Sequence, residues 1–338
     1  MSTTANGAGG ARNLRVGLIG LGSMGRHHAR VIRATPGMEL VAVADPGGDR
    51  FGVAGDLELL PDAAALIDVG LDAAMVAVPT VYHEEVALAL AEAGVPTMVE
   101  KPIAHSVAAG RRVADAFASR DLVGAVGYVE RCNPALRALR ERLDAGELGQ
   151  VYQVLTRRQG PFPARISDVG VVKDLATHDV DLTAWVAGSP YCSISAQVTH
   201  RSGRANEDMV VANGLLANGV IVSHTVNWLT PFKERVTIVT GEKGAFVADT
   251  LTGDLTFHAN GTVESSWDQV ANFRGVSEGD VIRYAIPKRE PLALEQERFR
   301  DAVRGVGHEH VTMAEGADTL AVVEAVLTSA SENRVVGL

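Results

Sequence analysis

The stretch DLATHDVDL, residues 174–182, combines a histidine with several carboxylates at helical spacing. Each residue of a helix advances by about 100°, so Asp174, His178 and Asp181 fall in one stripe beside an apolar face. A histidine is mostly neutral near pH 7 and is the readiest general base among the common side chains. The pattern predicts that Asp174 and His178 take part in acid–base chemistry, and it leaves Asp181 as a solvated side chain.

Each of these residues also has an ordinary structural interpretation. Asp174 could cap the first turn, and His178 could be a semi-buried histidine with satisfied hydrogen bonds. Lys101, in MVEKPIA at residues 98–104, favours the functional interpretation because it follows a predicted buried strand. The carboxyl ends of strands are where doubly wound sheets bind ligands. The alternative is that Lys101 only reaches into solvent beside Glu100.

The three side chains suit the oxidation of an alcohol. Loss of hydride from a carbon requires a base for the hydroxyl proton, and His178 is the default base. A lysine, with an ordinary pKa near ~10.4, is roughly 4 to 5 kcal/mol less available for that task. Lys101 would then stabilise alkoxide character as a cation, while Asp174 orients substrate or imidazole. Burial of the lysine would exchange the two roles, and both assignments stay open.

A glycine fingerprint identifies the element that would hold a cofactor. The stretch LRVGLIGLGSMGRHHARVIRAT, residues 14–35, runs from an apolar strand through Gly20, Gly22 and Gly25 into an amphipathic helix. This is G-x-G-x-x-G in its strand–turn–helix context, where the glycines allow a tight turn, approach of a pyrophosphate and close helix packing. The pattern predicts dinucleotide binding; a purely structural turn is the alternative.

Asp45 indicates which dinucleotide is bound. It ends a second predicted strand, MELVAVAD, at the distance where an acidic residue accepts the ribose hydroxyls and repels a 2′-phosphate. NAD is therefore favoured over NADP, although Arg50 lies close enough to keep NADP in consideration.

The remaining pattern predicts two domains. Strands and helices alternate up to LVGAVGY, which indicates an α/β Rossmann domain with a doubly wound parallel sheet over residues 13–128. From about residue 149 short alternating strands joined by glycine turns indicate an open, mainly antiparallel sheet, followed by two late helices. Residues 129–338 are thus expected to form an α+β domain for substrate binding and oligomerisation. An open apolar sheet face predicts a homo-oligomer, a dimer or tetramer.

Composition limits the partners. The formal charge of -10 argues against nucleic acid, and 46% hydrophobic residues are typical of a soluble globular protein. Residues 1–12 are small and polar and are expected to form a disordered tail, and no stretch is long and apolar enough for a membrane span. The two cysteines, Cys132 and Cys192, show no metal-ligand spacing, and His308 to His310 is expected to lie at the surface, so no metal site is predicted. A cytoplasmic location is expected.

Together the glycine fingerprint, AVPT with His83, EKP and DLATHDVDL resemble the Gfo/Idh/MocA oxidoreductases, which act on secondary alcohols of sugars, inositols and related polyols with NAD(P). The resemblance implies that Lys101, Asp174 and His178 are the catalytic positions. It also implies an extended set of cofactor contacts. The expected contacts are Gly20, Gly22, Ser23, Met24, Gly25, Asp45, Pro79, Thr80, His83, Glu100 and Lys101.

The substrate prediction comes from arginines near the expected domain junction. Arginine forks suit phosphates and carboxylates, and GYVERCNPALRAL with TRRQGPFPARISDVG resembles nucleotide-sugar 3-dehydrogenases of the family, such as those acting on UDP-N-acetylglucosamine. Cys132 stands where an aromatic residue is usual, and Ala176 where glycine is common. Surface arginines paired with acids are the alternative, and an inositol or free sugar remains an alternative substrate. The expected substrate contacts are Lys101, Arg131, Asn133, Arg158, Arg165, Asp174 and His178, with Arg157 beside them.

Overall fold

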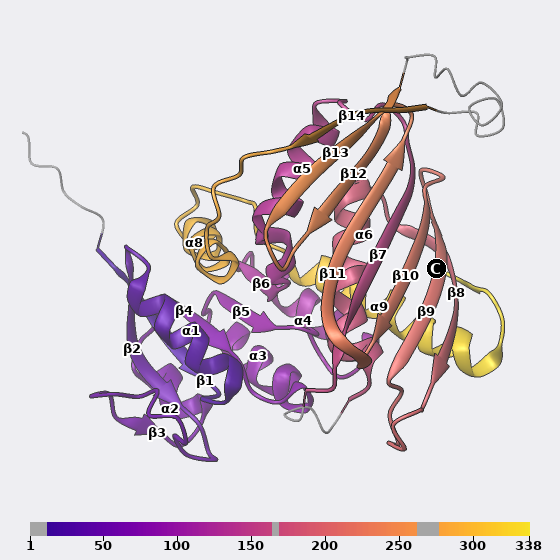
Figure 1. Ribbon diagram of the computed structural model, residues 1–338. Helices are drawn as coiled ribbons and strands as arrows, with labels where there is room; N and C mark the ends of the chain where they lie inside the picture. The colour runs from indigo at the N-terminus through magenta and orange to yellow at the C-terminus, as the bar shows by residue number, and fades with distance from the viewer. Residues whose placement is uncertain (1–11, 164–168, 262–276) are drawn as a thin grey trace, which may run out of the picture. The chain divides into compact units, whose positions relative to one another are not determined.

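The computed structural model describes residues 12–163, 169–261 and 277–338 (Figure 1). The chain forms two compact units, one of Met1–Gly127 with Leu292–Ala314 and one of Tyr128–Pro291 with Glu315–Leu338. The sequence indicated a boundary near residue 128, but it did not indicate the return of Leu292–Ala314 to the first unit. The expected tail lies outside the described residues except for Arg12, which pairs with Asp72 at 2.7 Å.

The first unit contains a six-stranded parallel sheet of order β3-β2-β1-β4-β5-β6. The strand order reverses between β1 and β4, which is where doubly wound sheets bind their ligands. The predicted doubly wound parallel sheet is confirmed. Its strands are β1 (Leu14–Ile19), β2 (Met38–Ala44), β3 (Leu59–Leu60), β4 (Ala73–Val76), β5 (Thr97–Glu100) and β6 (Gly124–Gly127).

Helices cover both faces of this sheet. Right-handed crossovers place α1 on one face and α3 on the other, where α3 packs between α2 and α4. The helix α8, from the returning segment, contacts α1 (Figure 1). Serine and aspartate caps begin two of the helices: Ser106 accepts from Ala109 N in α4, and Asp62 accepts from Ala65 N in α2. The helices are α1 (Ser23–Ala34), α2 (Ala63–Asp68), α3 (His83–Glu92), α4 (Val107–Ala118) and α8 (Pro291–Val303).

The second unit contains a nine-stranded sheet of order β14-β13-β12-β11-β7-β10-β9-β8-β15. Neighbouring strands are antiparallel except β7 and β10, which are parallel, so the predicted mainly antiparallel sheet is confirmed. The strands are β7 (Val151–Pro161), β8 (Tyr191–Thr199), β9 (Met209–Leu216), β10 (Ile221–Asn227), β11 (Leu229–Gly241), β12 (Gly244–Asp249), β13 (Asp254–Gly261), β14 (Ser277–Arg283) and β15 (Val336–Gly337).

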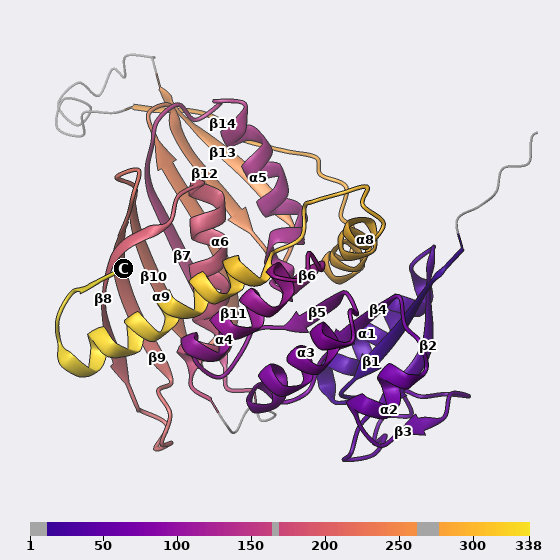
Figure 2. The same ribbon diagram turned by 180° about the vertical axis from the view of Figure 1, so that it is seen from behind.

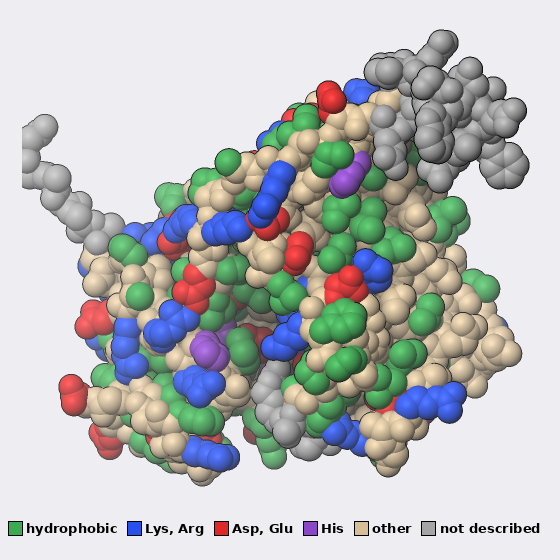
Figure 3. Space-filling model, viewed as in Figure 1, with side chains coloured by type: hydrophobic (Ala, Val, Ile, Leu, Met, Phe, Trp, Pro, Cys, Tyr) green, Lys and Arg blue, Asp and Glu red, His purple; other side chains and the backbone are tan. Residues whose placement is uncertain are grey.

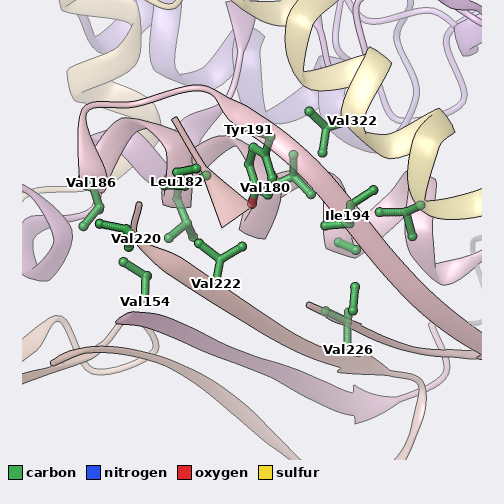
Figure 4. Packing of buried hydrophobic residues seen from close by; sticks show 14 of the residues in the cluster. Val154, Val180, Leu182, Val186, Tyr191, Ile194, Val220, Val222, Val226 and Val322 are labelled. Atoms are coloured by element: carbon green, nitrogen blue, oxygen red, sulfur yellow. The ribbon is translucent and has the colours of Figure 1, made fainter. Parts of the chain in front are cut away.

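Three helices pack on one face of the nine-stranded sheet: α5 (Pro134–Asp144), α6 (Thr177–Ala187) and α9 (Met313–Glu332) (Figure 2). Val180 and Leu182 of α6 meet Val222 of β10 and Val322 of α9 in the hydrophobic core (Figure 4). The alternation along β10, with Val222 buried and Ile221 exposed, assigns one face to this core. Fully burying such an aliphatic side chain contributes about 1.5 to 3 kcal/mol.

The opposite face of this sheet carries no helix within the described ranges, and hydrophobic side chains lie among polar and charged ones there (Figure 3). Val211, Leu215 and Ile221 are exposed on it, and Leu215 and Ile221 are direct partners across β9 and β10. In the described part of the chain, no helix has the length and apolar character needed to cross a membrane.

The two late helices predicted from the sequence are present as α8 and α9. The helix α5, the edge strands β14 and β15, and the short pair β3 and α2 were not predicted. In α5 the start signal is Asn133, whose side chain accepts from Ala135 N, followed by Pro134 at the first helical position.

Candidate active site

The turn from β1 into the first turn of α1 is too tight for side chains at two of its glycines. Gly20 has a φ of +91°, and a Cβ there would lie 2.5 Å from the Ala77 backbone, while a Cβ on Gly25 would lie 1.9 Å from Gly20 O. Gly22 differs, because no described atom lies within 4 Å of its Cβ position. Gly22 therefore leaves open space at the start of α1.

The first turn of α1 is suited to an anion. Gly22 is its N-cap and supplies no side-chain hydrogen bond, and the first turn contains no acidic residue. The N–H groups beginning at Ser23 and Met24 thus carry the positive end of the helix dipole without a competing carboxylate. This arrangement fits a pyrophosphate group.

Asp45 is part of the same loop structure. Its Oδ2 accepts from Leu21 N at 2.7 Å, and its Oδ1 accepts from Gly47 N at 2.8 Å. These bonds place the carboxylate beside the glycine turn, and each oxygen keeps a second lone pair for a hydroxyl donor. Nearby, the guanidinium groups of Arg26 and Arg50 lie 5.1 and 5.7 Å from the Phe51 ring centre.

Lys101 follows directly on β5 and is partly exposed, and its peptide bond to Pro102 is cis. Glu100 before it is 8% exposed, with Oε1 2.7 Å from His28 Nε2 and Oε2 accepting from Lys101 N at 3.1 Å. Burial opposes ionisation of Glu100, but the His28 hydrogen bond and the charge of Lys101 outweigh it, so the pKa of Glu100 lies below its ordinary value. A fixed negative charge thus adjoins Lys101.

The AVPT segment turns into α3 through a short 3-10 helix, Thr80–Tyr82, in which Pro79 O accepts from Tyr82 N. His83, the first residue of α3, is 1% exposed. Its Nδ1 lies 2.9 Å from Pro102 O, and its Nε2 lies 2.9 Å from Val78 O. Both ring nitrogens therefore face backbone carbonyls at the ends of β4 and β5.

In the second unit, Asp174 lies on a π-helical segment, Val172–Ala176, that precedes α6. The expectation of one regular helix over this stretch is wrong, because Thr177 N–H reaches back to Val172 O and adds a residue to the turn. Glu207 holds the start of this segment: its Oε1 accepts from Val172 N at 3.0 Å. Asp174 is 5% exposed, and His178 in the first turn of α6 is partly exposed.

Tyr128 contacts His178 and was not identified from the sequence. The two rings pack edge to face with centres 6.1 Å apart, and the Tyr128 hydroxyl lies 3.0 Å from Thr177 Oγ1. Tyr128 is fully buried, so the His178 imidazole packs against a side chain that has little freedom to move. No sequence pattern links residues this far apart.

Arg158 is enclosed by carboxylates. Its Nε donates to Asp179 at 2.9 Å and its Nη1 to Glu130 at 2.7 Å, and the residue is 2% exposed. Burial raises the pKa of Asp179, whereas for Glu130 the charges of Arg158 and Arg235 outweigh burial and lower the pKa. Arg235 adds a contact of 3.5 Å to Glu130, and its side chain is 34% exposed. Neither Glu130 nor Arg235 was predicted.

Arg131 is paired in the same way. It donates to both oxygens of Asp181, at 2.9 and 2.6 Å, and to Glu315 at 2.6 Å. The expectation of a solvated Asp181 is wrong: this residue is 1% exposed, and the arginine compensates its burial. Asn133 caps α5 and donates to Thr250 O.

Two further expected residues are placed elsewhere. Arg157 lies on the other face of β7 from Arg158 and pairs with Glu234 at 2.9 Å. Arg165 lies outside the described residues. Among those that are described, no group of three or more histidine, cysteine and acidic residues could hold a metal ion.

Two family models match the chain. Residues 14–128 match the oxidoreductase family with an NAD-binding Rossmann fold, and residues 136–247 match the GFO/IDH/MocA C-terminal domain. The chain is also 31% identical over 298 residues to UDP-N-acetylglucosamine 3-dehydrogenase of Acidithiobacillus ferrooxidans, an alignment that covers 86% of this chain and 89% of that protein. The chain belongs to the Gfo/Idh/MocA oxidoreductase family.

Other relatives agree with this membership. Inositol 2-dehydrogenase 2 of Saccharopolyspora erythraea is 33% identical over 221 residues, which are 62% of this chain and 65% of that protein. The solved structure of the Acidithiobacillus enzyme superimposes with a TM-score of 0.83 at 26% identity, covering 95% of this chain and 99% of that one. The predicted family is confirmed, and both of these relatives are dehydrogenases of CH–OH groups.

The first unit fits the dinucleotide that its family model names. The open space at Gly22, the acid-free first turn of α1 and the Asp45 carboxylate provide for a pyrophosphate and ribose hydroxyls. When bound, the nicotinamide cofactor supplies the acceptor or donor of a hydride.

Proposed function

We propose that this protein is an NAD-dependent dehydrogenase that oxidises a secondary ring hydroxyl, at C3 of a sugar or nucleotide sugar, to a ketone by hydride transfer. The observation that carries the proposal is the similarity to UDP-N-acetylglucosamine 3-dehydrogenase over 89% of that enzyme's length. Lys101, Asp174 and His178 are the proposed catalytic residues.

The roles of these residues follow from their chemistry. His178 accepts the proton of the reacting hydroxyl, because an imidazole is available as a base near neutral pH. Tyr128 supports this role by limiting rotation of the ring. Lys101 donates a hydrogen bond to the same oxygen and stabilises its developing negative charge. Asp174 orients either the substrate or the imidazole.

NAD is the proposed cofactor, with NADP less favoured. The support is Asp45, whose carboxylate lies against the glycine turn where it can accept ribose hydroxyls and repel a 2′-phosphate. The expected cofactor contacts remain those named from the sequence, with the exception of Glu100 and His83. Glu100 and His83 are buried and bonded within the protein, so we assign them indirect roles.

A neutral polyol or inositol is the second candidate substrate, and a specific observation favours it. Arg131 and Arg158, expected to bind an anionic group, each pair with two carboxylates inside the second unit. A ring bearing only hydroxyls needs no free arginine, since carboxylates and amides can accept and donate the necessary hydrogen bonds. Inositol dehydrogenases among the relatives agree with this candidate.

A substrate panel tests the proposal and separates the candidates. UDP-N-acetylglucosamine, related nucleotide sugars, free sugars and inositols are each incubated with NAD or NADP, and the absorbance of the reduced nicotinamide is followed. Turnover of a nucleotide sugar but not of an inositol supports the first candidate, and turnover of an inositol but not of a nucleotide sugar supports the second. Tight NADH binding with no turnover of any substrate would instead indicate a cofactor-sensing protein.

The proposal extends to a homo-oligomer, a dimer or tetramer, that acts in the cytoplasm. The support for the oligomer is the face of the nine-stranded sheet that carries no helix in the described residues and exposes Val211, Leu215 and Ile221, because exposed apolar side chains on an open sheet face commonly take part in protein contacts.

A further inference from the structure

The first unit contains two buried histidines beside Lys101. His28 on α1 is fully buried, and His83 on α3 is 1% exposed. A buried polar ring requires hydrogen-bond partners, and both rings find them on the segment Glu100–Lys101–Pro102.

His28 reaches this segment through a carboxylate. Gln296 Nε2, from α8, lies 2.9 Å from His28 Nδ1, and because an amide nitrogen can only donate, Nδ1 accepts and Nε2 is the atom that donates to Glu100 Oε1 at 2.7 Å. The other Glu100 oxygen accepts the Lys101 N–H. A continuous chain of hydrogen bonds therefore runs from α8 through α1 to the backbone of Lys101.

Glu100 is buried beside a glycine of the neighbouring strand. Its position is paired with Gly127 of β6, where a Cβ would stand 3.4 Å from the Glu100 carboxyl carbon. The carboxylate is therefore held between β6, His28 and the Lys101 N–H.

His83 reaches the segment from the other side. Its Nδ1 lies 2.9 Å from the carbonyl of Pro102, the residue after Lys101, and its Nε2 lies 2.9 Å from Val78 O at the end of β4. Burial lowers the pKa of His83, and the two carbonyls act against that shift. A neutral ring carries one N–H, and with that proton on Nδ1 it donates to Pro102 O while Nε2 lies against Val78 O.

We propose that His28 and His83 are positioning residues that fix the backbone on either side of Lys101, with Gln296 orienting His28 and Glu100 transmitting its constraint. The importance of Lys101 to turnover rests on the proposed function, but the constraint itself does not. Neither histidine touches the reacting atoms in this account.

Isosteric substitutions separate positioning from general stability. Asparagine places an amide nitrogen near Nδ1 of a histidine, and glutamine places one near Nε2. His83→Asn therefore keeps a donor to Pro102 O, whereas His83→Gln keeps a donor only to Val78 O. For His28 the preference reverses, because His28→Gln keeps the donor to Glu100 and His28→Asn loses it.

Acetic anhydride is used to label lysines in the full-length, cofactor-free protein, and the labelled peptides are quantified by mass spectrometry. The measured quantity is the labelling rate of Lys101 divided by that of the exposed Lys233. His28→Gln and His83→Asn should stay within about twofold of the wild-type ratio. His28→Asn and His83→Gln should label Lys101 about fivefold faster, the factor that loss of one buried hydrogen bond corresponds to. His105→Gln, at an exposed histidine, should change nothing.

The result that overturns the proposal is equal labelling within each asparagine–glutamine pair. Gln296→Leu provides a second route if a histidine variant does not fold: it leaves both rings in place and should still accelerate labelling, and an unchanged rate contradicts the proposal. Turnover is measured separately. A wild-type protein inactive on the whole substrate panel refutes the proposed function and leaves the labelling result to decide the positioning role.

Discussion

Replacing Arg158 by methionine should destabilise the second unit far more than the same change at Arg157. The two arginines are neighbours on β7, but Arg158 is 2% exposed between Asp179 and Glu130. Removing one partner from a buried ionic cluster costs about 3 to 5 kcal/mol, because the remaining charges stay buried. Arg157, with a side chain 45% exposed, pairs with Glu234 in solvent and should contribute about 0 to 1 kcal/mol.

The assay is denaturant unfolding followed by tryptophan fluorescence, because Trp185 and Trp228 lie in the second unit and the third tryptophan, residue 267, falls outside the described residues. Adding Asp179→Asn and Glu130→Gln to Arg158→Met should restore much of the lost stability, since the uncompensated charges are gone. Equal destabilisation by Arg158→Met and Arg157→Met would refute the interpretation of Arg158 as a structural ion-pair residue. It would also restore Arg158 as a candidate substrate contact.

Three further outcomes are expected. Burial lowers the pKa of His224 to about 4, below its ordinary 6.5, so the unfolded state binds a proton at a higher pH than the folded state. The free energy of unfolding of the second unit should therefore be highest above about pH 6.5 and fall by about 3 kcal/mol as the pH drops toward 4. In denaturant titrations, His224→Gln should remove most of this pH dependence. Gly22→Ala should weaken NADH binding while leaving the melting temperature nearly unchanged. Gly25→Ala should lower the melting temperature, because the Cβ at residue 25, unlike that at residue 22, would collide with backbone. Equal melting temperatures of the two variants would contradict this. Ile221→Lys should shift a homo-oligomer toward monomer in light scattering, and an unchanged mass would exclude this sheet face as the interface.

The fold was predictable where local patterns determine it. The glycine fingerprint between β1 and α1, with its strict limits at Gly20 and Gly25, is a local signal, and the alternation of strands and helices indicated a parallel sheet. The return of α8 to the first unit was not predictable, because Gln296 meets His28 across 268 positions of sequence.

The site was predictable only in part, for a similar reason. Asp174 and His178 could be singled out from their spacing. The π-helical turn that contains Asp174 and the packing of Tyr128 against His178 depend on tertiary contacts, which the spacing does not reveal. Arginines near the expected junction suggested an anion site from composition alone. In the structure Arg158 pairs with Asp179 and Arg131 with Glu315, and neither pair could be inferred from positions in the sequence.

The most direct test of the central claim compares turnover and cofactor binding in three proteins. With the best substrate of the panel, Lys101→Ala and His178→Ala should each reduce kcat by at least about a hundredfold, the contribution typical of a general acid–base group. Their dissociation constants for NADH should stay within about threefold of the wild-type value, because the first turn of α1 and Asp45 supply the proposed pyrophosphate and ribose contacts and Lys101 adds only one contact beside them. Full turnover in either variant would contradict the assignment of that residue to the chemistry.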